Sequence, residues 1–312
     1  MTRFLFWRLI TAIPTLFGMS LLAFFIVSLT PGDPVMQELR AMGSAFSPED
    51  VAAMRAEFGL DKPLPVRYVL WLGDAVRGEF GTSIASGRSV IDEISIYLPA
   101  TLTLAASALV GAVAISLTLG IAAVSAPRGV AALLRTFTVV LVSIPSFWMA
   151  LLLIWVFVMQ LGWARLVGNG SLGDLVLPTV TLSLAAGASL GRVVHERIRA
   201  EMCEDHVRLA IAKGQSPASI LIRHIAPRII GPLATAWANT LGALLGGAVI
   251  VETIFGWPGL GQLILQAIAQ RDYPIIQAYL VFMGLGYFAT SLLADVIVII
   301  SDPQLRRGLA YD

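Results

Sequence analysis

Residues 205–232, DHVRLAIAKGQSPASILIRHIAPRIIGP, form a polar and basic interval between two long apolar runs. Its basic side chains keep the segment out of hydrocarbon; they are Arg208, Lys213, Arg223 and Arg228. Its apolar side chains offer a small face to a protein partner; they are Val207, Ala210, Ile211 and Ile220. Gly214 can take the positive φ that ends a helix. The pattern predicts a short helix that contacts another protein, with an ordinary basic loop at a membrane surface as the alternative.

The composition identifies the class of protein. Hydrophobic residues make up 57% of the 312 residues and charged residues 13%, whereas charged residues form about a quarter of a soluble domain. The mean hydropathy is +0.82. An all-α integral membrane protein is therefore expected. The net charge of +1 does not indicate a nucleic-acid partner, because the arginines cluster at the ends of apolar runs. Cys203 is the single cysteine, so no internal disulfide is expected.

Apolar stretches long enough for membrane-spanning helices, which need about twenty residues, occur about six times. They are residues 9–29, 101–124, 136–161, 175–190, 229–254 and 275–300. The first is expected to be a retained signal anchor rather than a cleaved signal peptide, because no small-residue cleavage site follows it. The fourth is short and rich in small residues, so residues 185–189 are expected to face other helices. Pro145 predicts a kink in the third, with a hinge or a polar contact as the alternative.

The distribution of basic residues predicts the orientation. Arginines accumulate in alternate short loops, and such loops stay in the cytoplasm; these are Arg3, Arg8, Arg128, Arg135, residues 192–228, Arg306 and Arg307. In the opposite short loops Arg165 and Arg271 are each matched by an acid, Asp174 and Asp272. Both termini are therefore expected inside, and the long interval from residue 30 to residue 99 outside.

The long outer interval has features of a folded subdomain. PGDP at residues 31–34 ends the first helix. Residues 47–58 begin with SPED, a helix-start signal, and residues 66–76 form a second amphipathic pattern. Six large apolar residues supply contacts that a disordered segment lacks; they are Phe58, Leu60, Tyr68, Trp71, Leu72 and Phe80.

Several motifs in order along the chain resemble one transporter family. They are RLITAIPTLFGMSLLAFFIVSLTPGDPV at the start, GLDKPLPVRYVLWLGDAVRGEFGTSIASGRSV outside, SIPSFWMALLLIWVF, IVETIFGWPGLG, RDYPIIQA and DPQLRRG. Together with the interval at 205–232 they resemble the permeases of the dipeptide, oligopeptide and nickel ABC importers over nearly the whole chain. The resemblance implies a type I importer fold, with a signal-anchor helix at 1–30, an external subdomain at 31–99, a core permease domain at 100–304 and a cytoplasmic tail at 305–312. It also implies a bacterial inner-membrane protein.

The resemblance further implies a coupling loop, residues 191–232, that fits a cleft in an ATPase. The residues that match this pattern are Ala210, Ala212, Lys213, Gly214 and Pro232. Gly231 replaces the usual Leu and Pro227-Arg228 replaces the usual Arg-Asn, so the end of the loop is expected to bend differently. The implied partners are a homologous permease subunit, two ATP-binding subunits and an external solute-binding protein, besides membrane lipid.

The chain has no ATPase motif of its own. A phosphate-binding P-loop needs Lys followed by Ser or Thr, and the two lysines, Lys62 and Lys213, precede Pro and Gly. ATP and magnesium are therefore expected on partner subunits, and no catalytic or metal-ligating residue is predicted. The three histidines are assigned no ligand role; they are His195, His206 and His224.

Two acidic residues stand in apolar sequence, where a central Asp costs about 2.5 to 3.5 kcal/mol. Glu252 lies near the outer end of the fifth span and Asp295 within the sixth. Each is a candidate for lining the transport pathway, with a structural cap or ion pair as the alternative. Trp257, in the Gly- and Pro-rich turn after Glu252, is expected at the external mouth of the pathway.

The sequence favours one of three functions. A permease subunit of an ABC importer for peptides, nickel or metal chelates explains the motifs. An ion-gradient-driven secondary transporter is the alternative, but such proteins often contain internal repeats and no clear repeat is present. An intramembrane enzyme needs a catalytic group of residues within the spans, and none recurs there.

Overall fold

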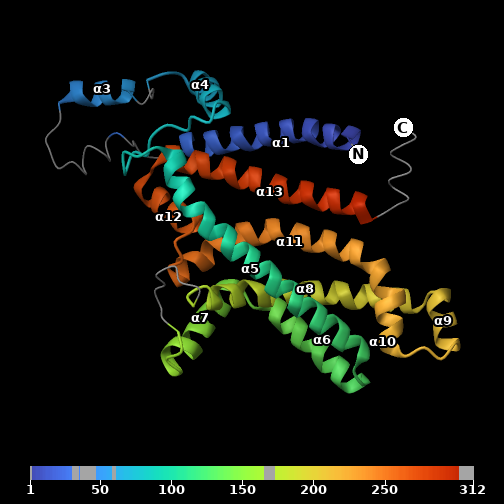
Figure 1. Ribbon diagram of the computed structural model, residues 1–312. Helices are drawn as coiled ribbons and strands as arrows, with labels where there is room; N and C mark the ends of the chain where they lie inside the picture. The colour runs from blue at the N-terminus through green and yellow to red at the C-terminus, as the bar shows by residue number, and fades with distance from the viewer. Residues whose placement is uncertain (1, 30–34, 36–46, 58–60, 165–172, 302–312) are drawn as a thin grey trace. The chain divides into compact units, whose positions relative to one another are not determined.

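The computed structural model describes residues 2–29, 35, 47–57, 61–164 and 173–301 (Figure 1). Within these residues it is helical and contains no strand, and one isolated β-bridge joins Thr82 to Ser89. Five described helices are long and apolar enough to cross a membrane, or six if one bent pair is a single span. The expectation of an all-α chain with about six spans is confirmed. The sequence expectations for PGDP at 31–34 and the tail at 305–312 lie outside the described residues.

The chain folds into two compact units. The first contains Met1–Phe6, Ala100–Trp257 and Tyr287–Asp312, and the second contains Trp7–Pro99 and Pro258–Gly286. One boundary between the units falls between Pro99 and Ala100, and the expected division of the chain into domains stays a prediction. Residues 7–30 and 258–286, however, belong to the same unit as the expected external subdomain.

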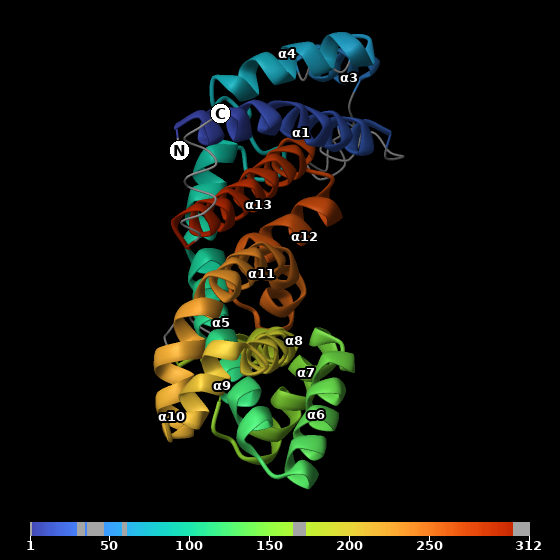
Figure 2. The same cartoon turned by 90° about the vertical axis from the view of Figure 1, so that its right-hand side faces the viewer.

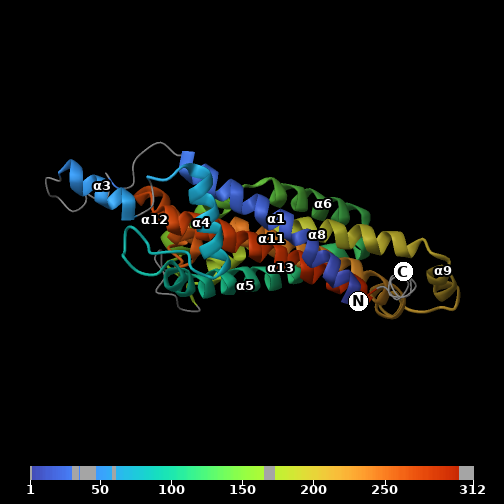
Figure 3. The same cartoon turned by 90° about the horizontal axis from the view of Figure 1, so that it is seen from above.

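The first unit contains the helices that carry the candidate site. They are most of α5 (Val90–Ser125), α6 (Arg128–Ser143), α7 (Ser146–Leu153), the π-helix η1 (Ile154–Gln160), α8 (Val176–Met202), α9 (Asp205–Ala212), α10 (Pro217–Ile220), the π-helix η2 (Leu221–Ile225), α11 (Ala226–Phe255) and the second half of α13 (Tyr273–Ser301). Figure 2 shows α6 and α7 beside α8. Figure 3 shows α9 at one end of α8.

Small residues bring α5 and α8 into close contact. Gly187 of α8 lies against Ile115 and the carbonyl of Ala112, and Gly120 of α5 lies against Val194. A hydrogen bond between a hydroxyl and the backbone accompanies this contact: Ser183 Oγ of α8 donates to the Ala108 carbonyl of α5 at 3.2 Å. Such approach without side chains is how helices associate in lipid. The expected contact of residues 185–189 is confirmed for Gly187 and Ala188, which are buried, whereas Ser189 is exposed.

The expected third span, residues 136–161, is not one continuous helix. The segments Arg128–Ser143 and Ser146–Gln160 meet at an angle of 100°. Ile144 between them is extended, with φ −79° and ψ 121°, because a residue before proline is disfavoured in the helical region. Pro145 then precedes α7. The expectation of a tolerated kink was wrong: this proline separates two helices.

The second unit packs α1 (Thr2–Leu29) against α4 (Leu64–Val76), and it also holds α3 (Pro48–Glu57), α12 (Leu260–Gln270) and the first half of α13. Tyr68 of α4 is buried and shares a 2.9 Å hydrogen bond with Ser20 of α1. Its ring meets Phe24 edge-on. The two helices expected in the outer interval, at 47–58 and 66–76, are confirmed by α3 and α4.

The segment that follows α4 is fastened by two buried carboxylates. Asp272 is 2% exposed and accepts a hydrogen bond from Ser83 Oγ at 2.5 Å. Glu93, 5% exposed, pairs with Arg88 at 3.0 Å and accepts from Ser86 Oγ at 2.7 Å. Because breaking a buried pair leaves an uncompensated charge, these contacts hold the segment in one conformation. The acid matched to Arg271 in the sequence, Asp272, thus acts as an acceptor within its own unit.

Candidate functional site

Helix α9 is short because both of its ends have clear stop signals. Glu204 before it is extended, and Asp205 in the first turn suits the positive end of the helix dipole. After Ala212 the chain reaches Gly214 with φ +72°, a conformation that glycine adopts without steric cost. The amide of Gln215 donates to the Ala210 carbonyl at 3.2 Å and closes the end. The predicted short helix followed by a positive-φ glycine is confirmed.

One face of α9 is buried in the chain's own core. Val207 is 0% exposed and Ala210 2% exposed. They belong to one cluster with residues of α8, α10, η2 and α11; its other members are Val194, Ile198, Ile220, Ile225, Ile229 and Leu233. This burial joins α9 to both long helices, α8 and α11, through packed side chains.

The burial corrects the apolar face that the sequence indicated. Val207, Ala210 and Ile220 cannot contact a partner with their side chains, because they fill the core beneath α9. Of the four predicted residues, Ile211 alone is exposed, at 54%. Leu209, which sequence reasoning missed, is 56% exposed. Its signal was its position between Val207 and Ala210, whose spacing of three residues marks the opposite, inward face.

The outward surface of α9 and its end forms an exposed ridge, which we define as Arg208, Leu209, Ile211, Ala212, Lys213 and Gly214. Two exposed apolar side chains stand beside two cationic ones on it. No atom lies within 4 Å of the position that a Cβ on Gly214 would occupy. The predicted residues Ala212, Lys213 and Gly214 therefore lie together on an accessible surface, and Ala210 lies beneath it.

The return from α9 to the membrane helix is ordered by local hydrogen bonds. Ser216 caps α10 by accepting the Ser219 amide at 3.3 Å, in the role that serine commonly plays there. His224 Nε2 and Gln215 Oε1 are 2.9 Å apart, and His206 lies 3.6 Å from Glu201. The contact between His224 and Gln215 thus connects η2 to the segment that follows α9. Among the described residues, no three His, Cys, Asp or Glu side chains gather as a metal site.

Pro232 lies inside α11 rather than at the end of the coupling loop. The irregular backbone comes earlier, at η2 and at Pro227 near the start of α11. Proline at the first turn needs no hydrogen-bond donor, and a π-helical turn accommodates the changed register. Pro232 is exposed, one turn beyond the buried Ile229. The expectation that this segment bends differently from the family pattern stays a prediction.

The other end of α11 carries the buried acid. Glu252 is 0% exposed and accepts a hydrogen bond from Thr101 Oγ1 of α5 at 2.7 Å. The Trp257 indole is 5% exposed, and its Nε1 donates to the Ala100 carbonyl at 2.9 Å. The helix ends at Gly256 with φ +63°, as expected for the Gly- and Pro-rich turn. Glu252 and Trp257 both fasten the end of α11 to the start of the α5 span.

The predicted site residues do not all meet. Ala226 and Glu252 are separated by 26 positions of one helix (252 − 226), or about 39 Å at 1.5 Å per residue. This exceeds the roughly 30 Å hydrocarbon core of a bilayer, so the ridge and Glu252 lie at opposite ends of a membrane-crossing helix. Asp295 is half-buried on α13. The roles of Glu252, Trp257 and Asp295 in a pathway stay predictions.

A double-mutant cycle tests the structural alternative for Glu252. We expect Glu252→Gln and Thr101→Val each to lower the melting temperature of the purified complex, because each weakens the contact between α5 and α11. The coupling energy between them should be about 0.6 to 1.7 kcal/mol, the range of such bonds in membrane proteins. Additive effects, together with reduced uptake at unchanged melting temperature in Glu252→Gln, would instead indicate a pathway residue.

The described part of the chain combines helices long enough to cross a membrane with the short helix α9, which packs against α8 and α11 and presents an exposed ridge. This arrangement defines the membrane subunit of a transporter. Residues 114–307 match the family described as binding-protein-dependent transport system inner membrane component, and residues 1–105 match its N-terminal family. The chain belongs to this family of permeases.

Curated relatives agree over nearly the full length. The glutathione transport system permease protein GsiC of Escherichia coli (strain K12) is 36% identical over 307 residues, which is 98% of this chain and 99% of the relative. The protein of the same name from Shigella flexneri serotype 5b (strain 8401) is 35% identical with the same coverage.

Solved transporters share the fold. An inward-facing structure of the MetNI methionine ABC transporter matches with a TM-score of 0.59 and 18% identity, covering 67% of this chain and 96% of that one. An amino acid ABC transporter matches with a TM-score of 0.51 and 20% identity, covering 67% and 92%. The chain is a multi-pass inner-membrane permease subunit of an ABC importer. It is not itself an enzyme, since ATP hydrolysis resides on separate subunits.

Proposed function

We propose that this chain and a second, homologous permease form a membrane pathway for peptides or for nickel and metal chelates, with peptides as the first substrate class to test. The relatives named as glutathione permeases support this choice. Two ATP-binding subunits carry ATP and magnesium, and an external solute-binding protein delivers the substrate. Uptake by the reconstituted complex discriminates the classes: competition by a nickel chelate but not by short peptides would contradict the peptide assignment.

The observation that carries the proposal is the exposed ridge on α9. Its apolar side chains, Leu209 and Ile211, are available to a partner, while Val207 and Ala210 anchor the same helix in the core. When the two ATP-binding subunits bind ATP and close together, they move the ridge. The packed core beneath α9 transmits this movement to α8 and α11. The pathway then alternates between outward and inward access.

Cysteine cross-linking tests this docking. In a chain with Cys203→Ser, we expect Leu209→Cys and Ile211→Cys to form cross-links to the ATP-binding subunit, because both side chains point away from the core. Ala85→Cys, exposed in the second unit, is the matched control and should form none. Equal cross-linking at all three positions, or at the control alone, would contradict a docking role for α9.

We propose that the termini and α9 are cytoplasmic and that residues 30–99 are external. The concentration of arginines near α9 supports this orientation. An impermeant thiol reagent applied to intact cells should label Ala85→Cys and not Ala218→Cys. Both positions are exposed, and neither substitution removes a side-chain hydrogen bond, as replacement of Ser86 or Ser216 would. The reverse labelling pattern would reject the orientation.

A further inference from the structure

A cavity of about 260 Å³ lies between α5, α6 and α8 in the first unit. Ala123 of its lining is two residues before the end of α5, Arg135 is in the second turn of α6, and His195 is in the last turns of α8. The cavity therefore lies at the same end of these helices as α9. Its volume is below the roughly 300 Å³ at which sites for drug-sized ligands begin, so it suits a smaller group.

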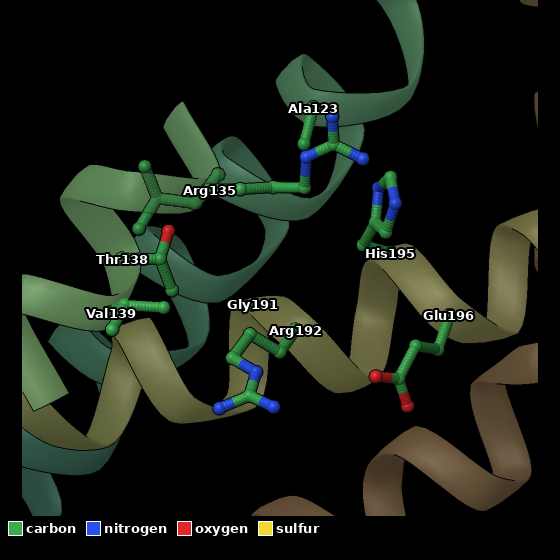
Figure 4. A pocket seen from close by; sticks show the side chains of 9 residues that line it. Ala123, Arg135, Thr138, Val139, Gly191, Arg192, His195 and Glu196 are labelled. Carbon is green, nitrogen blue, oxygen red and sulfur yellow. The ribbon is translucent and has the colours of Figure 1, made fainter. Parts of the chain in front are cut away.

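The charged groups that face this cavity are mainly cationic. Figure 4 shows Arg135 reaching from α6 toward His195, while Arg192 and Glu196 extend from α8 on the other side of that helix in the same view. Glu196 is the one carboxylate among the lining residues, and α5 contributes no charge. Arg199, one turn further along α8, adds another positive charge that interacts electrostatically with His195.

The two arginines have unused donors. Within the described part of the chain, neither Arg135 nor Arg192 forms a hydrogen bond or an ion pair. A guanidinium fork matches the oxygens of a phosphate and binds them in pairs. Arg135 brings one such fork beside the imidazole, and Arg192 adds a second fork to the lining of the same cavity, which makes a site for a phosphate-bearing anion.

The remaining walls are apolar and continue onto the outside of α6. Leu119, Ala123 and Val139 line the cavity, and α6 exposes a run of large apolar side chains beyond it, namely Phe137, Val139, Val140 and Val142. A soluble anion gains no stabilisation from this apolar surface, whereas an acyl chain packs against it. Basic pockets between membrane helices on the cytoplasmic side are known to hold anionic lipid head groups.

We propose that this cavity binds the head group of an anionic phospholipid, with the phosphate at Arg135 and His195, Arg192 adding positive charge to the same cavity, and the acyl chains along α6. The arginines of the cavity lie on α6 and α8. Helix α8 also supports α9, because its residues Val194 and Ile198 belong to the core beneath α9. Bound lipid would hold α6 against α8 near the point where the ridge is supported.

Native mass spectrometry of the purified importer complex, in micelles that contain equal phosphatidylglycerol and phosphatidylcholine, tests the proposal. We expect wild type to retain phosphatidylglycerol selectively. Arg135→Gln with Arg192→Gln should weaken its binding about 25-fold, since each basic side chain at an anionic surface contributes about fivefold. The paired control, Arg128→Gln with Arg197→Gln, changes exposed arginines outside the cavity and should bind as wild type. Arg135→Lys with Arg192→Lys should keep most of the binding.

Four outcomes would overturn the proposal. The first two are equal retention of the two lipids by wild type and unchanged phosphatidylglycerol binding in the double Gln variant. The third is displacement of the lipid by millimolar inorganic phosphate, which would indicate a soluble anion. The fourth is loss of the ATP-binding subunits from the double Gln variant while lipid binding stays intact. The last would make the cavity a protein interface. Melting temperature in phosphatidylcholine alone, expected to be equal for wild type and variant, shows that the variant is folded.

Discussion

Replacing Gly120 by Leu should prevent assembly of a stable permease complex. A Cβ at this position of α5 would lie 2.5 Å from Val194 Cγ1 and 2.9 Å from the carbonyl oxygen of Gly191. Rotation of the valine moves Cγ1 but not its Cβ, which would lie 2.6 Å away, and the carbonyl belongs to the backbone of α8, so neither can retreat unless the helices separate. Overpacking typically costs about 1 to 3 kcal/mol, and a clash with backbone over a whole leucine should exceed that range. Yield and melting temperature of the detergent-purified complex measure the effect.

Gly18→Leu is the matched control for Gly120→Leu. Gly18 also lies in a membrane-crossing helix, α1, but has no atom within 4 Å of its Cβ position, so its complex should melt close to wild type. Adding Val194→Ala to Gly120→Leu should restore little, because the Gly191 carbonyl remains. Near-normal stability of Gly120→Leu, or full rescue by Val194→Ala, would contradict the close helix contact described for α5 and α8.

Replacing Gly214 by Val should reduce transport and substrate-stimulated ATP hydrolysis at least tenfold while the membrane helices stay folded. Gly214 has φ +72°, and a residue with a Cβ loses about 1 to 2 kcal/mol in this left-handed conformation, more when it is β-branched. The open space around it means that the strain is relieved by a change in the ridge, not in the core. ATP hydrolysis in proteoliposomes, with and without substrate-loaded binding protein, measures the loss.

Two variants separate location from strain in this second prediction. Gly78→Val introduces the same substitution at φ +85° with equally open space, in the second unit, and should leave stimulated ATP hydrolysis unchanged. Gly214→Asn should retain much of the activity, since asparagine tolerates positive φ. Ala210→Leu, in contrast, should lower melting temperature and activity together, because Ala210 is buried. Full stimulation in Gly214→Val would argue against its place in the docking surface.

The sequence predicted those features that depend only on residues close to one another along the chain. Apolar length identified the spans, since about twenty residues in a helix cross the hydrocarbon core whatever surrounds them. Gly214 ended α9 as expected, because the preference for positive φ is a property of glycine itself. The fourth span was predicted at 175–190, yet α8 continues to Met202. Hydropathy detects the part within the membrane and misses a helix that extends beyond it with arginines on its surface.

Only the tertiary structure decided which side chains are available. Val207 and Ala210 look like a surface for a partner in the sequence, and the packing of α8 and α11 beneath α9 makes them core instead. Likewise, Thr101 and Glu252 are 151 positions apart, and no local pattern indicates their hydrogen bond. The cation-lined cavity joins Arg135 to His195 across two helices in the same way. Composition and periodicity act within one helix, whereas the choice of partner face depends on close approach between helices, which Gly120 and Gly187 permit at positions that hydropathy does not distinguish.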